Sequence, residues 1–204
     1  MIGVIDYGVG NVQAFLNLFK RIGTPAKRVV DSESLNKSSH LILPGVGHFD
    51  HVMKELNSSG LRNELDRLVM IKKVPVLGVC VGMQMLSEGS DEGDQPGLGW
   101  IPGRVRSMRE SLAFKNNRLP HMGWNSVLLS QQNLLTTGLN NESKFYFVHS
   151  YYVEVENKDD SLLKTKYDIN FDSAINHNNI YGAQFHPEKS HKFGMQLLKN
   201  FAKI

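Results

Sequence analysis

The segment Val76-Leu77-Gly78-Val79-Cys80-Val81-Gly82-Met83-Gln84-Met85 decides the fold of this chain. It begins as a short apolar run typical of a buried strand, and it continues into a helix. Between the two lies Gly-x-Cys-x-Gly, the pattern of a nucleophile elbow with sulfur in place of the serine oxygen. The glycines permit the sharp, strained turn of such an elbow, and the start of the following helix favours a thiolate. We therefore interpret Cys80 as a nucleophile, whereas a cysteine that only fills the core is the alternative.

Apolar runs alternate with amphipathic segments through the first half of the chain. Strands are expected at 2–6, 26–30, 40–43 and 74–79, and helical segments at 12–21, 52–56 and 61–69. This alternation predicts a parallel sheet whose strands are joined by right-handed crossovers.

The second half of the chain has a different pattern. After about residue 96, short β-type segments at 104–108, 125–129, 145–155 and 180–185 are separated by turns, and a final helix is expected at 192–201. Mixed or antiparallel pairing is expected there. We therefore predict an α/β fold of the flavodoxin-like type: an open, mostly parallel sheet with helices on both faces and an added antiparallel β portion in the second half.

Length and composition restrict the class of protein. With 204 residues, 41% hydrophobic and 21% charged, the chain is predicted to form one domain over 1–204, and disorder, collagen and coiled coil are excluded. The net charge of +3 gives no reason to expect a nucleic-acid partner. A single cysteine excludes an internal disulfide and a cysteine-rich zinc site, and no apolar stretch approaches the roughly 18 residues of a membrane span. We expect a cytoplasmic protein without a metal or other cofactor.

A candidate base for the thiol follows the strand expected at 180–185. In Gln184-Phe185-His186-Pro187-Glu188-Lys189, His186 could deprotonate Cys80, and Glu188 could orient the imidazole. The carboxyl ends of parallel strands meet at one edge of a sheet, so the two segments can converge despite their separation in the sequence. A solvated histidine ahead of a proline is the alternative interpretation of His186.

Backbone amides for an oxyanion are a further expectation at this edge. Leu43-Pro44-Gly45-Val46-Gly47 follows another strand and leads into a helical segment. Its unencumbered amides, together with the amide of Val81, could bind a developing oxyanion. A plain strand-to-helix turn is the alternative interpretation.

Two other motifs suggest different classes of site. Gly8-Val9-Gly10-Asn11-Val12-Gln13 follows the first strand and Asp31 ends the second, as in a dinucleotide-binding fingerprint, but Gln13 stands where the third glycine is needed. His48 and His51 share a helical face, but no second acidic or histidine pair accompanies them, and a metal site is not expected.

Several of these motifs together resemble one enzyme family. Three motifs are similar to those of the class I, or triad, glutamine amidotransferases: Pro44-Gly45-Val46-Gly47, Gly78-Val79-Cys80-Val81-Gly82-Met83-Gln84 and Phe185-His186-Pro187-Glu188-Lys189-Ser190. Three more motifs resemble those of one group within that class, the glutaminase subunits of imidazole glycerol phosphate synthase: Asp6-Tyr7-Gly8-Val9-Gly10-Asn11, Pro120-His121-Met122-Gly123-Trp124-Asn125 and Tyr146-Phe147-Val148-His149-Ser150-Tyr151. The resemblance extends from residue 1 to about residue 201.

The resemblance implies a glutaminase of histidine biosynthesis that hydrolyses L-glutamine to glutamate and ammonia. It implies delivery of the ammonia to a barrel-shaped cyclase subunit in a heterodimer, with Cys80 forming a glutamyl thioester, His186 as base and then acid, and Glu188 orienting His186. It also implies three further sets of residues: oxyanion-hole amides at Val46, Gly47 and Val81, glutamine contacts at Gly45, Gln84, His149, Ser150 and Tyr151, and partner contacts at Asn11, Trp124 and Lys189.

Some residues depart from the commonest pattern of this subunit, namely Val81, Met85, Ser87, Trp100 and His191. They resemble second copies of the subunit that accompany surface-polysaccharide genes, so the same glutaminase serving a sugar amidotransferase is one alternative. An inactive regulatory module that binds a nucleotide at the Gly8 to Gly10 turn is an alternative of another class. An inactive module would have no physical reason to keep Cys80, His186 and Glu188, which argues against this second alternative.

Overall fold

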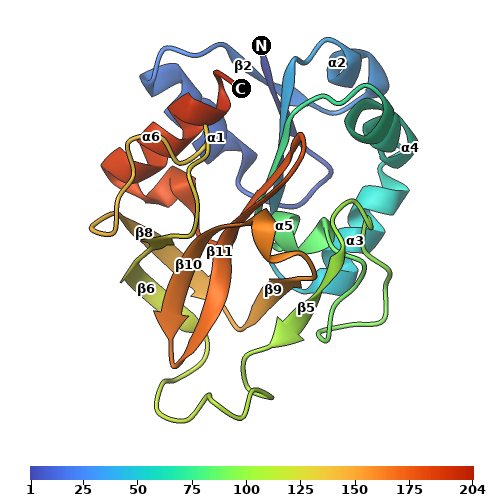
Figure 1. Cartoon of the computed structure of the whole chain (residues 1–204). Coiled ribbons are helices and arrows are strands. Elements are labelled where there is room, and N and C mark those ends of the chain that lie inside the picture. The colour runs from blue at the N-terminus through green and yellow to red at the C-terminus, as the bar shows by residue number, and fades with distance from the viewer.

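Parallel strands form the centre of the fold (Figure 1). The computed structural model describes residues 1–204, and its main sheet contains β1 (Ile2–Ile5), β2 (Ala26–Val29), β3 (His40–Gly45), β4 (Val76–Cys80) and β12 (Ile180–Ala183). These strands are parallel and lie in the order β2-β1-β3-β4-β12. β1, β4 and β12 are buried along their whole length. Strands covered on both faces have continuous apolar sequences rather than alternating ones, which explains the runs in this chain.

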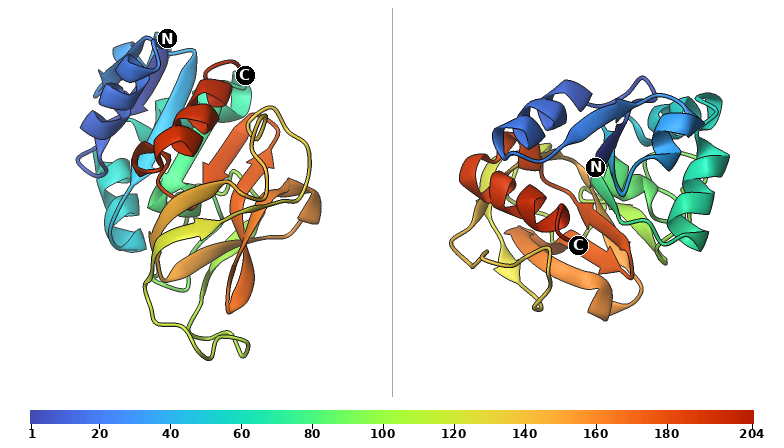
Figure 2. Two further views of the ribbon diagram at one scale, coloured as in Figure 1. Left: turned by 90° about the vertical axis from the view of Figure 1, so that its left-hand side faces the viewer. Right: turned by 90° about the horizontal axis from the view of Figure 1, so that it is seen from above.

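Helices cover both faces of this sheet (Figures 1 and 2). One face carries α1 (Val12–Arg21) and α6 (His191–Phe201), and the other carries α2 (Ser32–Asn36), α3 (Phe49–Ser58) and α4 (Arg62–Asp66), which continues into the π-helical turn η1 (Arg67–Ile71). α1 illustrates the packing, because it buries Val12, Phe15 and Phe19 on one stripe. None of the helices combines the length and the apolar character that crossing a membrane requires.

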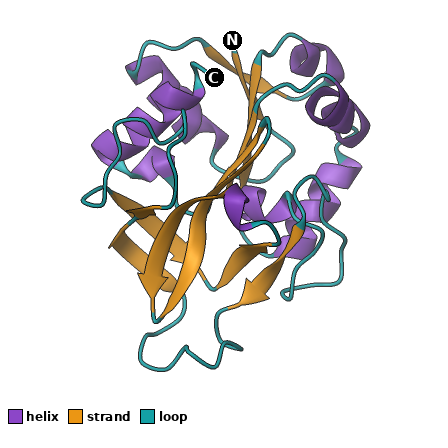
Figure 3. Ribbon diagram, viewed as in Figure 1, coloured by secondary structure: helices purple, strands orange, loops and turns teal.

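Antiparallel strands gather below the parallel part (Figure 3). β11 (Ile169–His177), β10 (Ser161–Tyr167) and β7 (Leu128–Leu129) extend the main sheet beyond β12, and two smaller sheets pair β5 (Gly103–Ser107) with β9 (Tyr151–Val155) and β6 (His121–Ser126) with β8 (Lys144–His149). Short 3-10 turns are η2 (Lys158–Asp160) and η3 (Pro187–Lys189), and α5 (Val81–Met85) follows β4. The predicted flavodoxin-like α/β fold with an added antiparallel portion is confirmed.

Two strand predictions in the second half were wrong. The segment 125–129 is not one strand, because the chain leaves its pairing with β8 after Ser126 and then pairs with β10 at Leu128 and Leu129. The segment 145–155 is broken at Ser150, where the chain passes from β8 to β9 and so from one small sheet to the other.

The strands β10 and β11 were not predicted. Their sequences mix polar and apolar residues without regular alternation, because polar side chains are buried between them. Asp172 on β11, for example, accepts hydrogen bonds from Ser161 Oγ (2.6 Å) and Lys164 Nζ (2.8 Å) on β10. A sequence pattern cannot distinguish such paired polar residues from solvent-exposed ones.

Candidate active site

Cys80 stands on a strained turn at the carboxyl end of β4. Its backbone is in the left-handed region, with φ 56° and ψ −116°, which a residue with a side chain rarely adopts. The neighbouring glycines are needed for space: a Cβ at Gly82 would lie 2.0 Å from the Leu43 carbonyl oxygen, and one at Gly78 would lie 2.5 Å from the Gly82 carbonyl oxygen. A Cβ at Gly45 would lie 2.5 Å from the Gly82 nitrogen. The close approach of β3, β4 and α5 therefore allows only glycine at these positions.

His186 and Glu188 form a buried pair directly after β12. His186 Nδ1 lies 2.8 Å from Glu188 Oε1, and the two side chains are only 4% and 2% exposed. The backbone around them is fixed, because His186 N donates to the Tyr146 carbonyl and Ser190 Oγ donates to the His186 carbonyl. His186 Nε2 and Glu188 Oε2 are buried without a hydrogen-bond partner. Burial alone lowers the pKa of His186, but the neighbouring Cys80 and Glu188 outweigh it and raise that pKa to about 9.

The sheet register brings these segments together. β4 lies between β3 and β12, with Cys80 beside Gly45 on one side and Val79 beside Ala183 on the other. The three strands are parallel, so the residues that follow them share one edge, and a cavity of about 350 Å³ lies there. It is lined by Val46, Gly47, Cys80, Val81, Gln84, Glu92, Val148, His149, Ser150, Tyr151, His186 and Lys189.

The Tyr151 carbonyl fixes the orientation of two buried amides. It accepts a hydrogen bond from Gln84 Nε2 (3.2 Å), whose second hydrogen goes to Gln184 Oε1 (3.1 Å). With its oxygen engaged, Gln184 turns its own Nε2 toward Cys80 Sγ, at 3.9 Å. Gln84 therefore has only its carbonyl oxygen left for a ligand in the cavity.

The same carbonyl fixes the protonation of a buried histidine pair. His149 Nδ1 lies 2.8 Å from the Tyr151 oxygen and must donate to it, so His149 Nε2 accepts from His121 Nδ1, at 2.9 Å. His121 Nε2 then accepts from Asn125 Nδ2 at 3.2 Å. Burial lowers the pKa of His149 to about 3 and that of His121 to about 4. Both rings are therefore weak bases with both nitrogens engaged in hydrogen bonds, and neither competes with His186 as the base.

Two cavity residues were not predicted, namely Glu92 and Val148. The Val148 carbonyl lies 4.0 Å from Cys80 Sγ, and the neighbouring motif 146–151 could have identified it. Glu92 lies in the irregular segment between α5 and β5, where its Oε2 accepts a hydrogen bond from Phe49 N (2.8 Å) at the start of α3. No motif marks it, because its place at the cavity depends on contacts with distant segments.

Some predicted residues lie outside the cavity lining. Gly45 packs against Gly82, Glu188 stands behind His186, and Asn11 caps α1 by accepting from Ala14 N. Trp124 is 48% exposed on β6.

Trp124 belongs to an aromatic group beside the cavity. It stacks on the His191 ring, with centroids 5.2 Å apart and 3° between the planes, and its ring meets the edge of Tyr146 at 6.2 Å. Lys189 Nζ lies 5.7 Å above the Tyr146 ring and also lines the cavity. The predicted partner contacts Trp124 and Lys189 are thus linked through Tyr146.

The motifs that suggested other sites have structural roles. Gly10, with φ 98°, packs so closely on Pro44 that a Cβ would lie 2.8 Å from the proline Cβ. His48 caps α3, since its Nδ1 accepts from Asp50 N (3.2 Å), and His51 lies 3.8 Å from Glu55.

Comparisons with known proteins agree with this geometry. The family model described as glutamine amidotransferase class-I matches residues 3–204. The chain is 52% identical to the imidazole glycerol phosphate synthase subunit HisH of Bdellovibrio bacteriovorus and 50% identical to the subunit named HisH 2 of Pseudomonas aeruginosa, over the full length of each chain. A crystal structure described as a glutamine amidotransferase superposes with a TM-score of 0.76 at 20% identity, covering 100% of this chain and 99% of the other, and shows the same fold.

The family match and the full-length relatives, together with the elbow at Cys80, lead to one conclusion: the chain belongs to the class I glutamine amidotransferases.

Proposed function

We propose that this chain is the glutaminase subunit of an imidazole glycerol phosphate synthase, hydrolysing L-glutamine through a thioester on Cys80. The observation that carries the proposal is the meeting of Cys80 and His186 in one cavity, at the carboxyl edge of β4 and β12, with Glu188 paired to His186 from behind. Its full-length relatives carry the HisH name, and ammonia from glutamine would pass to a cyclase partner in histidine biosynthesis.

The first half of the reaction forms the thioester. The Cys80 thiol gives its proton to His186 Nε2, the nitrogen that has no protein partner. The sulfur attacks the side-chain carbonyl carbon of glutamine, and amides at Val46, Gly47 and Val81 stabilise the oxyanion. The carbon–nitrogen bond then breaks, and the His186 proton goes to the nitrogen, which leaves as ammonia. A raised imidazole pKa favours the thiolate–imidazolium pair with which this sequence begins.

The second half of the reaction consumes one water molecule. His186 takes a proton from the water, the hydroxide attacks the thioester carbon, and the carbon–sulfur bond breaks with return of the proton to sulfur. The products are glutamate and free Cys80. Glu188 holds the imidazole throughout and stabilises its charged form.

The cavity walls match the amino-acid end of glutamine. Glu92 places a carboxylate on the wall, with Oε2 held by Phe49 N and Oε1 making no hydrogen bond within the protein. A carboxylate in this place suits the α-ammonium group of the substrate. Gln84 offers its side-chain carbonyl oxygen, and residues 149–151 line the same cavity.

The proposed partner surface consists of Asn11, Trp124, Lys189 and His191. Exposed aromatic side chains are enriched at protein interfaces, and the exposed Trp124 contacts Tyr146, whose ring lies below Lys189 at the cavity wall. α1, which Asn11 caps, packs against η3, which carries Lys189. A barrel-shaped cyclase bound here, in a heterodimer, would receive ammonia near its point of release.

A second candidate is the same glutaminase with a sugar amidotransferase as partner. The observation that favours it is His191, which departs from the common subunit pattern and stacks on Trp124 within the proposed partner surface. A changed residue at that place affects partner choice rather than the chemistry at Cys80.

The test is reconstitution with the cyclase subunit from the same organism. The proposal predicts glutamine-dependent formation of imidazole glycerol phosphate, release of glutamate, and loss of both in Cys80→Ala. It also predicts histidine auxotrophy in a deletion strain. Glutamate release without any imidazole product, together with prototrophy, would support the sugar partner, and no glutamate release with either partner would refute the glutaminase itself.

A further inference from the structure

The segment that carries Glu92 into the cavity is held by a carboxylate on each side. It runs between α5 and β5. As far as Asp91 its backbone pairs with β5, because Asp91 N donates to the Val105 carbonyl (3.0 Å) and Val105 N donates to the Gly89 carbonyl (2.9 Å). Glu92 has no such backbone partner, and its N donates to Ser90 Oγ (3.0 Å), so its place depends on side-chain contacts. Asp91, the residue before Glu92, anchors it to β5. Asp50, on α3, anchors the residues that follow.

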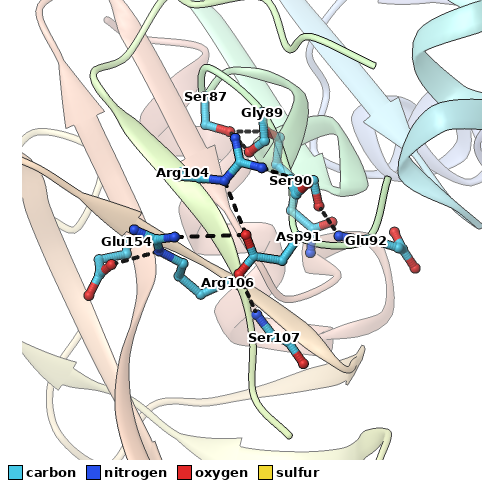
Figure 4. A network of polar contacts seen from close by, with 10 residues as sticks. Ser87, Gly89, Ser90, Asp91, Glu92, Arg104, Arg106, Ser107 and Glu154 are labelled. Atoms are coloured by element: carbon cyan, nitrogen blue, oxygen red, sulfur yellow. Dashed lines mark hydrogen bonds and ion pairs between the residues drawn. The ribbon is translucent and has the colours of Figure 1, made fainter. Parts of the chain in front are cut away.

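Asp91 lies at the centre of a charged network on β5 (Figure 4). Its Oδ1 accepts from Arg104 Nε at 3.1 Å and lies 3.8 Å from Arg106 Nη1, and its Oδ2 accepts from Ser107 N at 3.3 Å. Arg104 also donates from Nη2 to the Ser90 carbonyl at 3.2 Å, so one guanidinium fixes two consecutive residues of the segment. In Figure 4 the side chain of Glu92 points away from this network.

Asp50 holds the other side of the segment. Its two carboxylate oxygens accept from Gln95 N (2.9 Å) and Asp94 N (3.2 Å), and these backbone hydrogen bonds hold the pKa of Asp50 below its ordinary value. The intervening Gly93 lies so close that a Cβ would be 2.1 Å from Asp50 Oδ1. Glu92 therefore lies between Asp91, which contacts β5, and residues 94 and 95, which Asp50 holds beside α3.

We propose that Asp91 is a positioning residue for Glu92, holding its carboxylate at the place where the α-ammonium group of glutamine binds. This inference rests on the proposed function. Without the Asp91 carboxylate, Arg104 and Arg106 lose a shared partner and the Ser107 amide loses its acceptor. The backbone pairing with β5 remains, but the side-chain contacts that fix Asp91, directly before Glu92, are lost. A charged contact depends steeply on placement, and the amino-acid end of the substrate is the part affected.

The network offers a matched control in Glu154. Its carboxylate accepts from Arg106 Nε at 3.0 Å at the outer end of the same network, but it makes no hydrogen bond or ion pair with the segment 87–92. Glu154→Gln removes one negative charge from the network, as Asp91→Asn does, and leaves the anchor in place. A general electrostatic effect of the network would therefore appear in both variants, and a positioning effect only at Asp91.

The experiment compares glutamine with its analogue that lacks the α-amino group, 5-amino-5-oxopentanoate, by ammonia release from the complex with its partner. Asp91→Ala should raise the KM for glutamine about tenfold, with kcat within about twofold, and leave kcat/KM for the analogue unchanged. Asp91→Asn should give the same pattern to a smaller degree, and it serves as the informative variant where Asp91→Ala fails to fold. Glu154→Gln should match the wild type on both substrates.

Several results would overturn the proposal, and they differ from failure of the proposed function. If the Asp91 variants lose kcat/KM equally for both substrates, Asp91 supports the fold in general. If they lose kcat/KM for neither substrate, the contacts of Asp91 are dispensable. Glu92→Gln is the reference variant. If it does not lower kcat/KM for glutamine relative to kcat/KM for the analogue, Glu92 does not bind the ammonium group and Asp91 has nothing to position. Absence of ammonia release by the wild-type complex would instead refute the proposed function.

Discussion

His186 Nδ1 and Glu188 Oε1 lie 2.8 Å apart in a nearly water-free pair, with both side chains less than one-twentieth exposed (4% and 2%). The carboxylate engages one nitrogen of the ring, so only Nε2 is left to exchange a proton with a group in the cavity. Two residues of one short turn thereby decide which nitrogen reacts.

The first prediction concerns the charge of Glu188. Glu188→Gln keeps an oxygen that can accept from Nδ1 but does not stabilise the imidazolium, so kcat for glutamate release should fall about 10²-fold with partner affinity unchanged. Glu188→Ala, which removes the acceptor as well, should be slower still. Steady-state kinetics with saturating partner measure both, and full activity in Glu188→Ala would mean that the pair has no catalytic role.

The second prediction concerns stability at alkaline pH. The pKa of His186 rises from 6.5 to about 9 on folding, so the folded state binds the proton more tightly than the unfolded chain. The resulting stabilisation is complete below about pH 6.5 and is lost as the pH rises through about 9. Urea unfolding across this range should show a falling free energy of unfolding in the wild type, and His186→Gln should remove that part of the slope. If the free energy of unfolding has the same pH dependence in the wild type and in His186→Gln, His186 is not the group responsible.

The third prediction concerns stability at acid pH and has the opposite sign. The pKa values of His121 (about 4) and His149 (about 3) lie below the ordinary value, because both rings are buried. Their contribution is complete above about pH 6.5 and is lost as the pH falls toward 4 and 3, since the unfolded chain takes up protons first. His121→Asn keeps a donor near the Nδ1 position, so it should reduce the acid dependence and retain glutamine affinity. His121→Leu, which leaves His149 Nε2 without a donor, should raise the KM for glutamine.

The fourth prediction separates two kinds of glycine. A Cβ at Gly82 would lie 2.0 Å from the Leu43 carbonyl oxygen, so Gly82→Ala should cost about 3 kcal/mol or more of unfolding free energy, if the protein folds at all. Gly60 has φ +76° but no atom within 4 Å of its Cβ position, so Gly60→Ala should cost only about 1–2 kcal/mol. Thermal or urea unfolding of the two variants compares them directly. Equal costs would mean that the close approach of β3 to α5 makes Gly82→Ala no more costly than a substitution at an uncrowded glycine of positive φ.

Sequence patterns predicted those features that depend on neighbouring residues. The turn at Cys80 needs glycine beside it, and the strand before it is buried on both faces, so neighbouring residues in the sequence reveal both features. No such local pattern reveals β10 and β11, because Asp172 is buried with partners that only the fold brings to it. Glu92 was not predicted for a related reason: the residues that hold its segment in place include Asp50 on α3 and Arg104 on β5, and no spacing along the chain connects them with Glu92. Local geometry was therefore predictable, whereas contacts between distant segments were not.

Labelling with a diazo-ketone analogue of glutamine decides whether Cys80 is the nucleophile toward glutamine. We expect peptide mass spectrometry of the treated complex to find one adduct per chain, on Cys80, that is prevented by excess glutamine and absent in Cys80→Ala. An adduct on another residue, or none at all while the same complex releases glutamate, would contradict this role of Cys80.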